Sequence, residues 1–262
     1  MIDFEKNGIK AVILDMDGVL WKDSEPIGDL PAIFQRFSEE KILVILATNN
    51  ATSTVEQYLQ KILIMGVSLL EWQIVTSGQA VIFYLKQKYP SGSKIYVVGT
   101  EGLKSMVTGA GYVLDENRVA AVVVGVDREI TYEKIKIASK LIREGAEFIG
   151  TNPDKTFPTP EGLIPGAGSI IASVAAAAEK EPIFVGKPGK IMMDLSLSRL
   201  IGISREQVLQ VGDRLDTDIA AGQNYGCQTA LVLSGVTTRA MASSWKPEPD
   251  FIFNDLTEIV GA

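Results

Sequence analysis

The sequence has no histidine among its 262 residues and only one cysteine, Cys227. The lack of histidine excludes serine–histidine and cysteine–histidine catalysis, as well as zinc sites built on histidine. Acid–base chemistry must therefore use carboxylates, lysine or tyrosine. A single cysteine excludes an internal disulfide, and its place at the start of an apolar run predicts a small packed residue.

Long apolar runs and positive net charge are absent too. No apolar run approaches the roughly 20 residues of a membrane span, and the first ten residues lack the apolar core of a signal peptide. We therefore expect a cytoplasmic protein. The formal charge of -7 favours neither nucleic acid nor an anionic membrane as a partner. If the substrate is an anion, a local group must supply positive charge.

Short apolar runs rich in β-branched residues alternate with segments of helical periodicity. Val55, Leu59, Ile62 and Met65, for example, recur every three to four residues. This alternation predicts an α/β fold with a mostly parallel sheet flanked by helices. The expected strands are residues 11–14, 42–47, 95–98, 119–126, 147–149, 183–185, 208–211 and 229–233.

Two turn-rich segments, at residues 88–93 and 178–182, mark candidate domain boundaries. The segment between them contains strands and helices of its own. We therefore predict an inserted α/β domain over residues 91–181. The outer parts, 1–90 and 182–262, would form one discontinuous core domain.

Ligands of parallel sheets bind beyond the carboxyl ends of the strands, so the residues that follow each run are candidates. Asp15 and Asp17 follow the first run, and Gly18 comes next. Two such carboxylates repel each other unless a cation or a shared proton intervenes, and Mg²⁺ prefers oxygen ligands. Taken alone, an Asp- and Gly-rich surface turn explains the pair equally well.

The next candidates are Thr48, Asn49 and Asn50, which follow the second run and precede a predicted helix. A hydroxyl, two amides and free helix N–H groups form an uncharged anion site, although helix capping explains the same residues. Lys187 follows the run 183–185, where its ammonium can neutralise phosphate. It is not a Walker lysine, because Pro188 stands where Ser or Thr is required.

The last candidates follow the run 208–211. Asp213 comes just after the strand, and Asp218 lies about one helical turn further on, from where it can reach the same ion. Asp216 is predicted to be the helix N-cap. A calcium loop is not favoured, because the required glycine and final glutamate are absent.

In this chain order the candidates resemble the four motifs of the haloacid dehalogenase superfamily of phosphatases. The inserted region resembles the NagD-like, p-nitrophenylphosphatase branch, which carries a class IIA cap. That part of the resemblance rests on residues 151–154, 165–169 and 186–188. One departure is Ala51, where the branch usually has serine after the two asparagines.

The resemblance implies a Rossmann-like three-layer core with a parallel sheet, plus an inserted α/β cap domain. It implies a Mg²⁺-dependent phosphatase in which Asp15 is the nucleophile and Asp17 the general acid–base. The metal would be held by Asp15, the backbone carbonyl of Asp17 and Asp213, with Asp218 orienting these ligands. The implied phosphate-binding residues are Thr48, Asn49, Asn50 and Lys187.

Several questions stay open at this level. A phosphotransferase or mutase acting on a sugar phosphate would use the same residues, and a non-catalytic phospho-ligand binding module is a further alternative. The expected partner is a small phosphorylated metabolite: a nucleotide, a sugar phosphate or pyridoxal phosphate. A homodimer through the cap is expected from the branch. Asp154 and residues 166–169 are candidates for substrate contact, although turn and helix-start chemistry explains them as well.

Overall fold

The chain forms two compact α/β units, which the computed structural model describes over residues 1–159 and 162–262. Unit 1 consists of Met1–Thr48, Val55–Val75 and Met193–Ala262. Unit 2 consists of Asn49–Thr54 and Thr76–Met192. Most of unit 2 is thus an insertion in the sequence of unit 1. The domain limits predicted from the sequence stay a prediction.

The larger sheet has the strand order β15-β14-β13-β1-β4-β5, and its described pairs are parallel. β1 lies between β13 and β4, with Leu14 opposite both Val211 and Leu46. The carboxyl ends of these three strands therefore meet at one edge of the sheet. The strands are β1 (Ala11–Leu14), β4 (Leu43–Thr48), β5 (Ile74–Thr76), β13 (Val208–Gly212), β14 (Gln228–Val232) and β15 (Phe251–Phe253).

Helices cover both faces of this sheet. Val12 and Leu14 of β1 pack in one hydrophobic core with Phe37 of α1 and Ile259 of α10. On the other face Gly222 of α8 lies so close that a Cβ there would be 2.6 Å from Thr229 Cγ2. The remaining elements of this part of the chain are α1 (Leu30–Glu39), α2 (Val55–Ile64), η1 (Glu71–Gln73), α7 (Lys190–Ser198), η2 (Arg205–Gln207), the π-helix η3 (Leu215–Ile219), α8 (Ala220–Tyr225), α9 (Arg239–Ser244) and α10 (Leu256–Val260).

Local sequence explains where these helices begin. The side chain of Asp29 accepts a hydrogen bond from Ala32 N at 3.1 Å and so caps α1, and Pro31 lies in the first turn. Leu30, Ile33 and Phe37 then recur at helical spacing and are buried. α1 thus turns one apolar face to the sheet.

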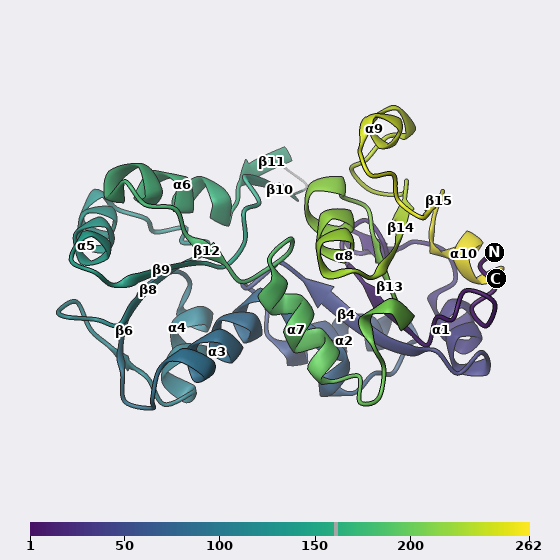
Figure 1. The fold of residues 1–262 in the computed structure, drawn as a ribbon, viewed down its shortest axis with the longest axis horizontal. Coiled ribbons are helices and arrows are strands. Elements are labelled where there is room, and N and C mark those ends of the chain that lie inside the picture. The colour runs from purple at the N-terminus through teal and green to yellow at the C-terminus, as the bar shows by residue number, and fades with distance from the viewer. Residues whose placement is uncertain (160–161) are drawn as a thin grey trace. The chain divides into compact units, whose positions relative to one another are not determined.

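Unit 2 contains its own parallel sheet, in the order β12-β9-β8-β6-β7. Within this unit, α5 and α6 lie on one face of the sheet, and α3 and α4 lie on the other (Figure 1). The elements are α3 (Ser77–Lys88), β6 (Lys94–Val98), α4 (Glu101–Gly109), β7 (Val113–Leu114), β8 (Ala121–Val124), α5 (Tyr132–Arg143), β9 (Glu147–Gly150), β10 (Thr156–Thr159), β11 (Gly162–Pro165), α6 (Ala167–Ala178) and β12 (Ile183–Phe184).

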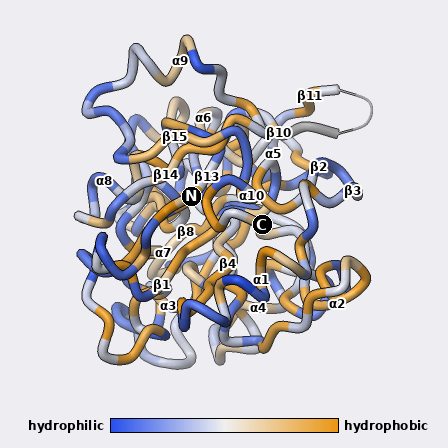
Figure 2. The backbone as a smooth tube through the Cα atoms, turned by 90° about the vertical axis from the view of Figure 1, so that its right-hand side faces the viewer, coloured by the Kyte–Doolittle hydropathy of each residue, from blue (hydrophilic) through white to orange (hydrophobic). Residues whose placement is uncertain are grey.

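The predicted α/β class is confirmed, and each of the eight predicted strands is present within a few residues of its expected limits. The sequence did not predict β5, β7, β15 or the hairpins β2 (Trp21–Lys22) with β3 (Glu25–Pro26) and β10 with β11. These strands are two to four residues long. In Figure 2 the β2–β3 turn is blue, whereas the buried β1 and β4 are largely orange. None of the helices described is long and apolar enough to cross a membrane.

Candidate functional site

Three carboxylates gather at the carboxyl edge of the unit 1 sheet. Asp15 follows β1 and Asp213 follows the neighbouring β13, while Asp218 comes from η3. Each offers an oxygen within 4.8 Å of those of the other two. Asp213 is 2% exposed and Asp218 is 1% exposed. We call these three residues the carboxylate cluster.

Backbone N–H groups and glycines shape this cluster. Val236 N donates to Asp213 Oδ2 at 2.6 Å, and Arg214 N donates to Asp218 Oδ2 at 3.1 Å. A Cβ on Gly235 would lie only 1.9 Å from Asp213 Oδ2, so no larger residue fits there without displacing the carboxylate. Gly18 has a φ of +82°, and a Cβ there would lie 2.7 Å from the same oxygen. Both glycines thus let the backbone approach Asp213 closely.

The donor set of the cluster fits a divalent metal ion. Like-charged carboxylates raise one another's energy when they are buried, and a bound cation removes that cost. An all-oxygen set is what hard cations such as Mg²⁺ and Ca²⁺ prefer. The cluster is therefore the place in unit 1 where a metal ion would bind.

Asp17, the second aspartate of the predicted pair, has its side chain outside this cluster. Its carboxylate is exposed, and Oδ1 accepts a hydrogen bond from Trp21 Nε1 at 2.8 Å. The chain between them is a tight turn, closed by a bond from Gly18 N to Trp21 O of 2.8 Å. A contribution of Asp17 to metal binding through its backbone carbonyl stays a prediction.

Unit 2 holds a second group of predicted residues, around Asn49. Asn49 Oδ1 accepts from Lys187 N at 2.8 Å, and its Nδ2 donates to Lys187 O at 2.9 Å and to Asp154 Oδ2 at 3.0 Å. Lys187 is 1% exposed and Asn49 is 8% exposed. We call Asn49, Asp154 and Lys187 the amide–lysine cluster. Both N–H groups of the Asn49 amide are used within it, so this side chain holds the loop that carries Lys187.

The main chain at Asn49 is fixed as well. Its carbonyl oxygen accepts from Ser77 Oγ at 2.6 Å and from Asn152 Nδ2 at 2.7 Å. The neighbouring Asn50 forms a local turn, because its Oδ1 accepts from Thr52 N at 2.8 Å and Thr52 Oγ1 at 2.7 Å. Thr48, the last residue of β4, is 3% exposed.

Two local predictions have clear outcomes. Asp216 is not the helix N-cap, because η3 begins at Leu215 after Arg214, and Asp216 forms an ion pair with Arg214 at 3.5 Å. The helix starts two residues earlier than the sequence suggests. The glycine-rich stretch at 166–169 does begin a helix, since Gly166 is the N-cap residue of α6.

Sequence reasoning missed some of the residues around these clusters. Ser234–Val236 follow β14, and Ser234 Oγ donates to Gly18 O at 2.7 Å. Asn152 follows β9 and lies in the stretch 151–154 that carries part of the resemblance, but the sequence predicted no role for it. Residues 234–236 follow a predicted strand, where the strand-end rule looks for candidates. No sequence signal points to the partnership of Trp21 with Asp17.

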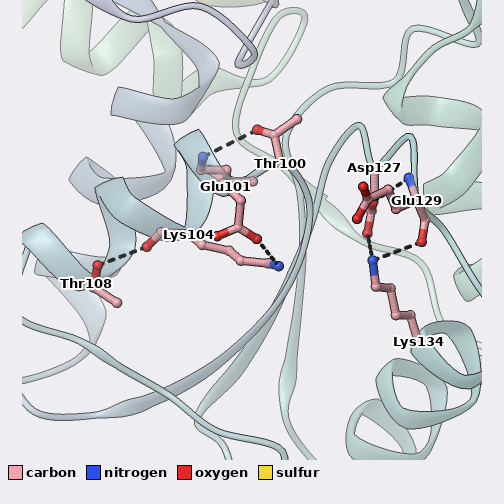
Figure 3. A network of polar contacts seen from close by, with 8 residues as sticks. Thr100, Glu101, Lys104, Thr108, Asp127, Glu129 and Lys134 are labelled. Atoms are coloured by element: carbon pink, nitrogen blue, oxygen red, sulfur yellow. Dashed lines mark hydrogen bonds and ion pairs between the residues drawn. The ribbon is translucent and has the colours of Figure 1, made fainter.

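Other polar residues at strand ends of unit 2 have structural roles. Lys134 pairs with the buried Asp127 at 2.8 Å after β8, and Lys104 pairs with Glu101 at 2.6 Å after β6 (Figure 3). Thr100 caps α4 by accepting from Leu103 N. In unit 1, burial raises the pKa of Cys227 to about 12, and Glu206 adds to the effect. Its thiol is therefore protonated at neutral pH, as expected of a packed residue.

Comparisons with known proteins identify the class. A haloacid dehalogenase-like hydrolase family matches residues 12–113, and a HAD-hydrolase-like family matches residues 184–259. An acid sugar phosphatase of Staphylococcus epidermidis is 36% identical over 248 residues, which cover 94% of this chain and 95% of that protein. The chain therefore belongs to the haloacid dehalogenase-like hydrolases.

Solved structures narrow the class to a branch. The p-nitrophenyl phosphatase of Archaeoglobus fulgidus has a TM-score of 0.90 and 33% identity, and covers 97% of this chain and 98% of its own. NagD from E. coli K-12 has a TM-score of 0.88 and 30% identity, and the match covers 96% of this chain and 98% of NagD. The predicted resemblance to the NagD-like, p-nitrophenylphosphatase branch is confirmed. Phosphatases of this family generally use a divalent metal, which agrees with the carboxylate cluster.

Proposed function

We propose that this protein is a Mg²⁺-dependent phosphatase that moves the phosphoryl group of a small phosphorylated metabolite onto Asp15 and then to water. The observation that carries the proposal is the carboxylate cluster. It sets Asp15, the first aspartate of the family motif, among buried carboxylates that suit a divalent cation. Relatives named acid sugar phosphatase and p-nitrophenyl phosphatase support the same reaction class.

In the first step a carboxylate oxygen of Asp15 attacks phosphorus, and the bond from phosphorus to the leaving oxygen breaks. A carboxylate is ionised at neutral pH, so Asp15 needs no base to activate it. The electron pair goes to the leaving oxygen, which takes a proton from Asp17 and departs as an alcohol. Asp15 now carries an acyl phosphate.

In the second step water attacks the phosphorus of this aspartyl-phosphate and gives a proton to Asp17. The bond from phosphorus to Asp15 breaks, and its electron pair restores the carboxylate, so both aspartates return to their starting states. Asp15 and Asp213 would hold the metal, with the backbone carbonyl of Asp17 as a further ligand and Asp218 orienting these ligands. When bound, the metal neutralises charge on the phosphoryl oxygens.

We assign binding of the phosphoryl group to Thr48, Asn49, Asn50 and Lys187. Lys187 supplies a positive charge, which an acidic protein needs locally to bind an anion. Since the amide hydrogens of Asn49 are already used, its part in binding would be to fix the backbone on either side of Lys187. A sugar phosphate is the substrate class we favour, because curated relatives are named acid sugar phosphatases. We also propose that the protein forms a homodimer and lies in the cytoplasm.

The test is phosphate release from a panel of sugar phosphates, nucleotides, pyridoxal phosphate and p-nitrophenyl phosphate, with and without Mg²⁺. Rapid quenching and mass spectrometry should find the added phosphoryl group on Asp15. Asp15→Asn should lower turnover at least about 1,000-fold, because an amide is a poor nucleophile. Full activity in that variant would overturn the proposal. Phosphate release that requires an acceptor sugar would instead indicate a phosphotransferase.

A further inference from the structure

The hairpin β2–β3 contains a contact to Asp17 that the proposed reaction does not use. Trp21, the first residue of β2, is fully buried, and its Nε1 donates to Asp17 Oδ1 at 2.8 Å. An indole N–H can only donate, so Oδ1 must act as an acceptor in this bond. A carbonyl oxygen is a stronger acceptor than a hydroxyl oxygen, so this bond favours the proton of Asp17 on its other oxygen, Oδ2.

Lys61 of α2 holds the other side of this hairpin. Its Nζ lies 4.1 Å from the centroid of the Trp21 ring, a cation–π distance. The same Nζ donates to Asp23 O at the hairpin turn, at 2.9 Å. Burial lowers the pKa of Lys61, and the nearby charges of Asp17 and Asp23 partly oppose that shift. Lys61 therefore lies close enough to Asp17 for their charges to interact.

We propose that Trp21 and Lys61 are positioning residues that fix the Asp17 carboxyl group so that Oδ2 delivers the proton to the leaving oxygen. This inference rests on the proposed function, in which Asp17 is the general acid. Without the indole bond, the exposed carboxyl group of Asp17 would be free to rotate, and either oxygen could face the substrate. Lys61 acts through the indole, by packing on its face and tying down the turn next to it.

A purely structural role for Trp21 makes a different prediction. Trp21 belongs to the main hydrophobic core of unit 1, so a damaged core would lower activity toward every ester alike. Loss of proton delivery would depend on the leaving group. An alkoxide needs a proton to depart, whereas 2,4-dinitrophenolate is stable without one. The ratio of activities toward the two kinds of ester therefore distinguishes a role in proton delivery from a purely structural role.

The experiment measures kcat/KM for an alkyl phosphate that the wild type hydrolyses and for 2,4-dinitrophenyl phosphate, in saturating Mg²⁺. Trp21→Phe keeps an aromatic ring and removes the N–H. We expect its loss on the alkyl ester to exceed its loss on the dinitrophenyl ester by about tenfold or more. Lys61→Met should shift the ratio of the two activities in the same direction by about threefold. Lys61→Arg should have the wild-type ratio.

Two matched controls use groups of the same chemistry elsewhere in unit 1. Trp245→Phe also removes an indole hydrogen bond, from Trp245 Nε1 to Gln223 Oε1 at 3.1 Å. Lys22→Met removes an exposed positive charge from the same hairpin. Neither should change the ratio between the two esters.

Equal losses on both esters, or no loss, in Trp21→Phe and Lys61→Met would overturn the inference. A ratio change in Lys22→Met as large as that in Lys61→Met would overturn the role of Lys61. Should Trp21→Phe fail to fold, Lys61→Met decides alone, because its side chain is only partly buried. The proposed function fails separately, if the wild type cleaves neither ester or Asp15→Asn retains activity.

Discussion

The carboxylate cluster of unit 1 and the amide–lysine cluster of unit 2 are built on opposite electrostatic principles. In the first, Asp15, Asp213 and Asp218 bring like charges together at a sheet edge. In the second, one amide satisfies a backbone N–H, a backbone carbonyl and the carboxylate of Asp154 at once. A cation would offset the negative charge of the first cluster, whereas the second joins its polar groups to one another. The first is therefore suited to bind a metal, and the second fixes the backbone at Lys187.

The largest expected effect tests whether unit 1 depends on a cation. Asp213→Asn should lower activity by about 100-fold or more, because it removes a charged ligand. Mg²⁺ at 100 times its Kd should stabilise the wild type by about 2.7 kcal/mol and the variant much less. Without metal, the variant should unfold at the same temperature as the wild type or higher, since repulsion is relieved. Thermal unfolding with EDTA or Mg²⁺ measures this.

Asp216→Asn is the matched control for that prediction, because Asp216 is exposed and lies three residues after Asp213, in the π-helix η3. Its Mg²⁺ dependence should equal that of the wild type. A metal-free Asp213→Asn protein that is clearly less stable than metal-free wild type would contradict the repulsion argument.

A second prediction tests the amide–lysine cluster by an isosteric change. Asn49→Asp removes both N–H donors and sets a carboxylate against Lys187 O and Asp154 Oδ2, so we expect a loss of about 2 kcal/mol or more in unfolding free energy. Substrate affinity should fall with it, while Mg²⁺ affinity should not change. Asn117→Asp is the stability control, since it makes the same change at an exposed position of unit 2. Chemical unfolding measures the stability, and Mg²⁺ titration calorimetry measures the metal affinity. A loss of Mg²⁺ affinity in Asn49→Asp would contradict the independence of the two clusters.

A third prediction concerns the close packing of unit 1. Gly235→Ala should cost about 1–3 kcal/mol and weaken Mg²⁺ binding, because the new Cβ must displace Asp213 Oδ2. Gly109→Ala in α4 is the control, since no neighbouring atom lies within 4 Å of a Cβ there. It should be neutral or slightly stabilising. Denaturant and Mg²⁺ titrations measure the stability and the metal affinity of both variants. Equal values for the two variants would contradict the importance of the close contact between Gly235 and Asp213.

The smallest effect is expected at Cys227, outside both clusters. Burial raises the pKa of its thiol to about 12, above the unfolded value. The stabilising contribution is complete below the unfolded pKa and is lost as pH rises from about 8.5 toward 12. Thiol reagents at pH 8 should modify the unfolded protein and not the native one. Mass spectrometry measures the extent of modification. Rapid modification of Cys227 in the native protein would contradict this prediction.

The sequence was informative where one strand and the residue after it carry the signal. Continuous apolar runs predicted β1, β4 and β13, and the polar residue after each run predicted Asp15, Thr48 and Asp213. The strands β5 and β15, of three residues each, were not predicted. The predicted N-cap of η3 was wrong. The N-cap residue is Arg214, and its backbone N–H donates to Asp218 Oδ2.

The sequence by itself determined the α/β class, the family and the three aspartates that gather at the sheet edge, since these follow from hydrophobic periodicity and from residue types at strand ends. Only the tertiary structure decided which groups hold them. The bonds of Val236 to Asp213, of Asn49 to Lys187, and of Trp21 to Asp17 depend on loop paths. Such paths are set by close approaches of the backbone and by packing between segments far apart in the chain, which local sequence does not encode.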